Sequence, residues 1–149
     1  MKTLFSNADL DEILRRLDGL KPGANRQWWK MDVAQMLAHC SAAMEVAAGQ
    51  AFPPRLFIGR ILGPLFKKSF VGEKEFGKNS PTDPSYVVTD QRNFDREKSR
   101  LVAVVRQFGE GGEAKCTTHP HPFFGNLTPR EWSIAMYKHL DHHLRQYGA

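Results

Sequence analysis

The stretch Thr128 to Gly148, TPREWSIAMYKHLDHHLRQYG, specifies the start and the end of one long helix. Thr128 and Glu131 form a T-x-x-E capping box, and Pro129 takes the first helical position. Behind them, apolar side chains recur every three or four residues, at Trp132, Met136, Leu140, Leu144 and Tyr147. This spacing predicts an amphipathic helix that runs to about Gln146, and with it an all-α protein.

Three of the six histidines of the chain, His139, His142 and His143, lie in this helix. At about 100° per residue, His139 and His143 share the apolar side one turn apart, whereas His142 points toward the flank. Imidazole is the commonest transition-metal ligand in proteins. Helical geometry alone leaves two interpretations of the pair open: metal ligands, or hydrogen-bonded residues at the edge of the core.

Three further helices are expected. The segment 6–20 has helical apolar spacing with Ser6 or Asn7 as N-cap, and the segment 28–49 carries an apolar stripe that stops at Gly49. The third pattern begins at about Asp90 and ends at Gly109. These segments predict a single domain over residues 1–149, a four-helix bundle with a long connection between helices two and three.

The long connection, residues 50–89, contains the apolar and basic stretch RLFIGRILGPLFKKSF at 55–70. Pro64 argues against one unbroken helix there, and we expect the stretch to pack over the bundle. The alternative is an amphipathic surface segment for lipid or a partner subunit. The segment 116–126, CTTHPHPFFGN, is expected to be a loop because two prolines and a glycine interrupt it.

Composition excludes several classes of protein. Hydrophobic content of 41%, charged content of 25% and the lack of a long apolar run predict a soluble protein with no membrane span. The first residues lack signal-peptide features, and Cys40 and Cys116 form no CxxC pair, so we expect a cytoplasmic protein. The net charge of +5 comes from scattered basic residues without a nucleic-acid motif, so no nucleic-acid partner is expected.

Two stretches carry a family resemblance: WWKMDVAQMLAHC at 28–40 and HPFFGNLTPREWSIAMYKHLDHHLRQYG at 121–148. Together they resemble the DinB/YfiT-like superfamily, for which the resemblance implies metalloenzymes, and within it an uncharacterised domain-of-unknown-function branch. The resemblance implies a DinB-like four-helix bundle in which His39, His139 and His143 hold a divalent metal ion. Imidazole ligands suit zinc, nickel or iron, so the metal itself stays open.

The resemblance also implies a class of chemistry. Members of the superfamily include thiol-dependent transferases and isomerases, in which the metal holds a low-molecular-weight thiol as its thiolate. It therefore implies a metal- and thiol-dependent S-transferase or a hydrolase, with a small-molecule thiol or substrate as partner. The alternative is a non-catalytic metal-binding or stress-response helical module. A homodimer stays open, and no catalytic residue is assigned.

The remaining histidines carry weaker expectations. His39 lies about 110° from the centre of its helix's apolar stripe, a direction that suits a seam with a neighbouring helix. His119 and His121 lie in the 116–126 loop, where turn structure and hydrogen bonds to the backbone are the first interpretation and metal ligation the second.

Two further expectations concern the surroundings of the site. Glu45, Asp141 and Glu131 are candidates to accept the second N–H of a ligand histidine, although each is more often a surface carboxylate. A cleft bordered by the metal and by part of the 50–89 connection is expected, with three cations available to meet a cofactor's carboxylates: Arg55, Arg60 and Lys67.

Overall fold

The computed structural model describes residues 1–80 and 82–149, and within them the protein is all-α with no strand. The α-helices are α1 (Asn7–Gly19), α2 (Val33–Ala47), α3 (Phe57–Val71), α4 (Phe94–Gly111) and α5 (Pro129–Gln146), and the 3₁₀ turns are η1 (Pro84–Tyr86) and η2 (Glu113–Lys115). The predicted fold class is confirmed. In these residues no helix is both long and apolar enough to span a bilayer.

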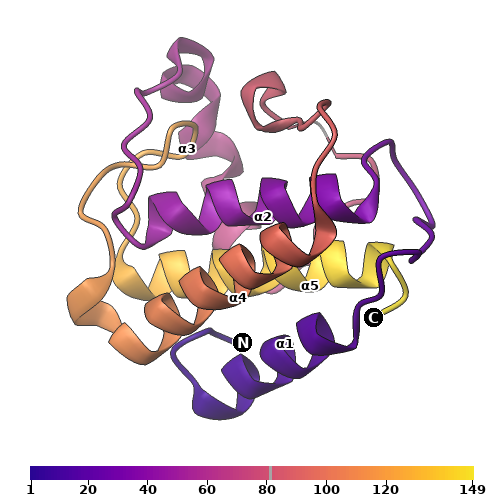
Figure 1. The fold of residues 1–149 in the computed structure, drawn as a ribbon. Coiled ribbons are helices and arrows are strands. Elements are labelled where there is room, and N and C mark those ends of the chain that lie inside the picture. The colour runs from indigo at the N-terminus through magenta and orange to yellow at the C-terminus, as the bar shows by residue number, and fades with distance from the viewer. Residues whose placement is uncertain (81) are drawn as a thin grey trace.

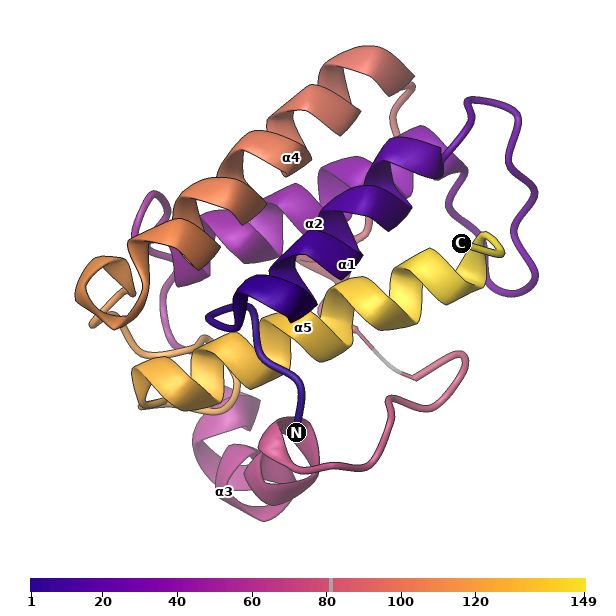
Figure 2. The ribbon, with the colours of Figure 1, turned by 90° about the horizontal axis from the view of Figure 1, so that it is seen from below.

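Four helices, α1, α2, α4 and α5, pack around one core (Figure 1). The helices α1 and α2 each contact both α4 and α5. The view from below shows the same arrangement (Figure 2). The largest fully buried side chains include Trp132, Phe108, Met44 and Leu37. Burying side chains of this size contributes roughly 1.5–3 kcal/mol each.

The helix starts follow local sequence signals. Ser6 caps α1 by accepting from the Asp9 N–H, as one of the two predicted N-caps. The Thr128–Glu131 capping box and Pro129 begin α5 where the sequence predicted. A second capping box, Asp32 with Gln35, begins α2. Each box satisfies backbone N–H groups that would otherwise lack partners at a helix start.

The predicted bounds of the third sequence-derived helix were wrong at both ends. It is α4, and it begins at Phe94, because the Asn93 side chain accepts from the Arg96 N–H and caps it there. Gly109 does not end it: a Cβ there would lie 2.7 Å from the Leu10 side chain, so this glycine allows α1 to approach closely. The helix stops instead at Gly112, whose φ of +61° favours glycine.

The expectation that Pro64 prevents an unbroken helix was also wrong, since α3 runs through it. Proline inside a helix costs about 3 kcal/mol, so tertiary contacts must offset it. The Lys138 ammonium donates to the carbonyls of Ser69, Phe70 and Gly72 at the end of α3. The Gly63 backbone approaches so closely to the Phe123 carbonyl that a Cβ would lie 2.2 Å from its oxygen.

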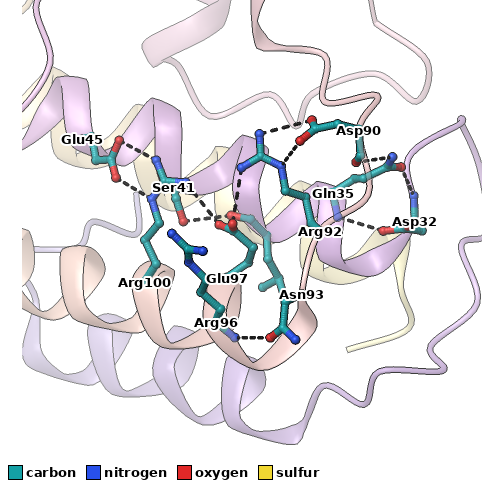
Figure 3. A network of polar contacts seen from close by, with 11 residues as sticks. Asp32, Gln35, Ser41, Glu45, Asp90, Arg92, Asn93, Arg96, Glu97 and Arg100 are labelled. Carbon is teal, nitrogen blue, oxygen red and sulfur yellow. Dashed lines mark hydrogen bonds and ion pairs between the residues drawn. The ribbon is translucent and has the colours of Figure 1, made fainter.

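The α2–α4 contact has a polar edge (Figure 3). Arg100 of α4 donates to both carboxylate oxygens of Glu45 at 2.7 and 2.8 Å and to the buried Glu97 at 3.2 Å. Arg92 extends this network, because it forms ion pairs with both Glu97 and Asp90. A buried carboxylate needs such partners, because an unpaired charge there would carry a large desolvation cost.

Candidate metal centre

Three histidines from two helices converge at the α2–α5 seam. His39 comes from α2, and His139 and His143 come from successive turns of α5. Their ring centroids lie 4.8 to 5.0 Å apart, and one nitrogen from each lies within 4.8 Å of the other two. The side chain of His39 lies away from the centre of the apolar stripe of α2, and this direction brings it to the α2–α5 seam, as the sequence suggested.

His39 has a fixed tautomer. Its Nδ1 lies 2.8 Å from the Tyr86 carbonyl oxygen, which can only accept, so Nδ1 carries the proton. The lone pair of the neutral ring is then on Nε2, which lies 3.0 Å from His139 Nε2. Burial lowers the pKa of His39, which keeps the ring neutral and its lone pair available.

His143 is fixed in the same way through Gln146. The Gln146 side-chain nitrogen donates to the Trp28 carbonyl at 2.7 Å, so its Oε1 faces His143 Nδ1 at 2.8 Å. Nδ1 of His143 must therefore be the donor, which leaves the lone pair on Nε2. Burial lowers the pKa of His143 to about 3.

His139 lies between the two. Its Nδ1 is buried and makes no hydrogen bond within the described part of the chain, although part of the residue stays accessible to solvent. Burial, followed by the repulsion that a positive charge would meet from a protonated His143 or His39, holds its pKa well below the usual value. Among the described residues, hydrogen bonds therefore satisfy only one nitrogen of this ring, Nε2, which lies 3.0 Å from the lone pair of His39 Nε2.

These residues fit a divalent transition metal. Metal-bound histidines usually donate their second N–H to a carbonyl, carboxylate or water, and Tyr86 and Gln146 provide such acceptors. Two imidazole nitrogens on one zinc-like ion are about 2.9–3.4 Å apart for bonds of about 2.0–2.1 Å. The 3.0 Å between His39 and His139 Nε2 falls in this range, and it also suits a hydrogen bond.

His142 stays outside this group, as the sequence predicted, but it is not a surface residue. Its ring packs edge-on against Trp28 and lies 6.2 Å from the Phe76 ring, and only 9% of the residue is exposed. Burial lowers its pKa. The flank direction alone predicts a surface-type stability change within about 0.5 kcal/mol for His142→Ala, and this burial makes that value too small.

The loop histidines have structural partners. His119 Nε2 lies 2.7 Å from the Pro53 carbonyl, and His121 Nδ1 accepts the backbone N–H groups of Phe123 and Phe124. Burial lowers the pKa of His121 to about 4, which matches an imidazole that must stay an acceptor. The first interpretation of both, turn structure with backbone hydrogen bonds, is confirmed.

None of the three candidate carboxylates accepts from a ligand histidine. Glu45 pairs with Arg100, Asp141 with Arg16 and Arg145, and Glu131 with Lys67 and the α5 cap. The groups that accept from the ligand histidines are instead the backbone carbonyl of Tyr86 and the side-chain amide of Gln146. Gln146 had a sequence signal, since it lies three residues after His143 on one helix. No sequence signal pointed to Tyr86, because it contributes only its backbone carbonyl, a group that every residue has.

The expected cleft is met only in part. A cleft of about 470 Å³ is bordered by α5, with Tyr137 and Lys138, and by part of the 50–89 connection, with Glu73 and Phe76, but none of the three histidines lines it. Arg55 donates to the Pro122 carbonyl and Lys67 to the Asn126 carbonyl. Arg60 is exposed on α3. These contacts give the three cations no role at the histidines.

Comparison with known proteins gives one relationship. No curated protein and no solved structure matches the chain. The family described as "Protein of unknown function (DUF1569)" matches residues 2–148, which is nearly the whole length and includes all three histidines and both of their hydrogen-bond partners. The chain therefore belongs to the DUF1569 family.

Proposed function

We propose that this protein is a divalent-metal protein of the DinB/YfiT-like type. In this proposal the ligands are the Nε2 atoms of His39, His139 and His143, with at least one coordination position left for water or a thiolate. The observation that carries it is the pair of fixed tautomers: Tyr86 and Gln146 each hold a proton on Nδ1, so the Nε2 lone pairs of His39 and His143 are both free within a cluster whose ligand nitrogens lie within 4.8 Å of one another.

The activity that this site supports best is metal-dependent transfer to or from a small thiol, or hydrolysis. A bound dication would lower the pKa of a coordinated thiol or water and so supply the nucleophile near neutral pH. The chain's own groups hold the ligands neutral by burial and orient them through Nδ1. His139 keeps partial solvent exposure, which the proposal needs for an exchangeable ligand to reach the site.

A non-catalytic metal-binding module is the second candidate. The observation that favours it is that the carboxylates nearest in sequence to the ligands are engaged in ion pairs, so none is free to act as a general base: Glu45, Glu131 and Asp141. A thiol transferase needs no such base if the metal itself lowers the pKa of the thiol.

X-ray absorption at the metal edge tests the proposal and separates the two candidates. Protein purified without a polyhistidine tag would be loaded with zinc and measured with and without a monothiol. The proposal expects about three imidazole nitrogens at about 2.0–2.1 Å and, on adding thiol, a new sulfur at about 2.3 Å. A saturated shell that excludes sulfur would favour the non-catalytic module, and a shell without imidazole would overturn the site.

A further inference from the structure

Most of the large hydrophobic side chains that are exposed in the described part of the chain belong to α3. Four of them form a ridge, Phe57, Ile58, Ile61 and Leu65, which are 79%, 56%, 62% and 73% exposed. Phe66 of the same helix is also exposed. With full residue areas of about 150–200 Å², the four ridge residues alone expose roughly 400–550 Å², near the upper end for the largest patch of a monomer.

The direction of this ridge is fixed by the opposite side of α3. Gly59 and Gly63 are buried against Phe123, and a Cβ at either would lie within 2.6 Å of its backbone. Lys138 holds the last carbonyls of the helix, and Phe70 stacks on Phe124 at 4.0 Å. Both views place α3 to one side of the other four helices (Figures 1 and 2). The ridge therefore cannot turn inward without breaking these contacts.

The charged side chains of the segment that carries the ridge are all basic, and Glu131 of α5 pairs with one of them, Lys67. Between Gln50 and Gly72 the sequence has four basic residues, Arg55, Arg60, Lys67 and Lys68, and no acidic one. At about 100° per residue Lys68 projects beside Phe57 and Ile61, and Arg60 projects about 60° from Phe57. Long cationic side chains at the edge of an apolar ridge can extend toward phosphate groups while the apolar residues enter the acyl boundary.

We propose that α3 docks this protein on an anionic lipid surface, with the helix lying in the plane of the membrane interface. Charge complementarity favours this occupant over a second copy of the chain. A two-fold dimer through α3 would bring two copies of the segment 50–72 together, and this segment has four basic residues but no acidic residue to pair with them across the interface. The ridge also falls short of the roughly 800 Å² that each partner buries in a stable interface.

Vesicle co-sedimentation with the full chain tests the proposal. Wild-type protein should sediment with mixed phosphatidylglycerol and phosphatidylcholine vesicles, less at high salt, and much less with pure phosphatidylcholine. Ile61→Ser with Leu65→Ser should weaken binding about tenfold or more, since both apolar side chains leave the interface. Because both residues are exposed, the thermal unfolding midpoint should stay near that of wild type.

Charge provides the matched control. Arg60→Glu with Lys68→Glu should abolish binding to the anionic vesicles, whereas Lys21→Glu with Lys30→Glu, an equal change at exposed positions between α1 and α2, should leave most of it. Wild-type protein that does not sediment, or equal binding by the two charge variants, would overturn the proposal. So would a concentration-dependent dimer that Leu65→Ser dissociates, since the ridge would then be a protein interface.

Discussion

Gln146 connects the candidate metal centre to the rest of the fold, and its replacement gives the most specific prediction. The side chain is fully buried, accepts from His143 Nδ1 and donates to the Trp28 carbonyl. Gln146→Leu leaves that N–H and that carbonyl without partners. Each unsatisfied buried group costs about 1–3 kcal/mol, so the free energy of unfolding of the metal-free protein should fall by about 2–6 kcal/mol.

The same substitution should weaken metal binding, because His143 loses the acceptor that fixes its tautomer and ring orientation. Losing such a partner typically costs about 10–100-fold in metal affinity. Urea unfolding gives the stability, and competition with a chromogenic chelator gives the affinity.

Gln146→Glu separates the two effects. Its carboxylate can still accept from His143 Nδ1 but cannot donate to the Trp28 carbonyl, so it should lose stability yet keep metal affinity within a few-fold of wild type. The exposed Gln107→Leu, which removes only the Gln50 contact, should change stability by no more than about 0.5 kcal/mol. Wild-type metal affinity in Gln146→Leu would refute this assignment of the His143 tautomer.

The remaining predictions test the fold and the other histidines. Thr128→Ala should lower the free energy of unfolding by about 1 kcal/mol in urea, and no change would mean that another group caps α5. Gly63→Ala should lower the free energy of unfolding by about 1–3 kcal/mol, because the added Cβ would meet the Phe123 carbonyl. Gly19→Ala is the control: its Cβ would meet nothing within 4 Å, so it should be neutral or slightly stabilising. Equal effects of the two substitutions would contradict the close packing of α3. In the metal-free protein the pKa of His121 is lower in the folded than in the unfolded state, so as the pH falls the unfolded chain takes up a proton at this residue before the folded protein does. The free energy of unfolding should therefore keep its full value above about pH 6.5 and decrease toward pH 4, by up to about 3 kcal/mol from this residue. His121→Asn, which keeps an oxygen acceptor for the same N–H groups, should make that fall smaller by this amount, while the other buried histidines keep their share. An unchanged pH profile would contradict the assignment to His121.

Sequence signals located the parts of this fold that local chemistry determines. The Thr128–Glu131 box and Pro129 placed the start of α5 because a cap needs only four consecutive residues. The i, i+4 spacing likewise brought His139 and His143 to one face. Gly109 was misread as a helix end, because only the position of α1 shows that it is there for close packing.

The parts that depend on tertiary contacts could not be read in this way. The path of α3 through Pro64 depends on Lys138 and on the Phe123 loop, both more than fifty residues away. Helical phase placed His142 on a flank, but the burying aromatic residues, Trp28 and Phe76, come from two distant segments. The earlier expectation of about 0.5 kcal/mol or less for His142→Ala therefore rises to roughly 1–2 kcal/mol for a buried ring.

Metal content of the histidine variants tests the central claim most directly. Untagged wild-type protein and the alanine variants of His39, His139, His143 and His142 would be dialysed against the same limiting zinc and analysed for bound metal per chain. The three-histidine site predicts about one ion in wild type and in His142→Ala, and a sharp loss in each of the other three variants. Equal loss in all four, or full occupancy in His143→Ala, would contradict it.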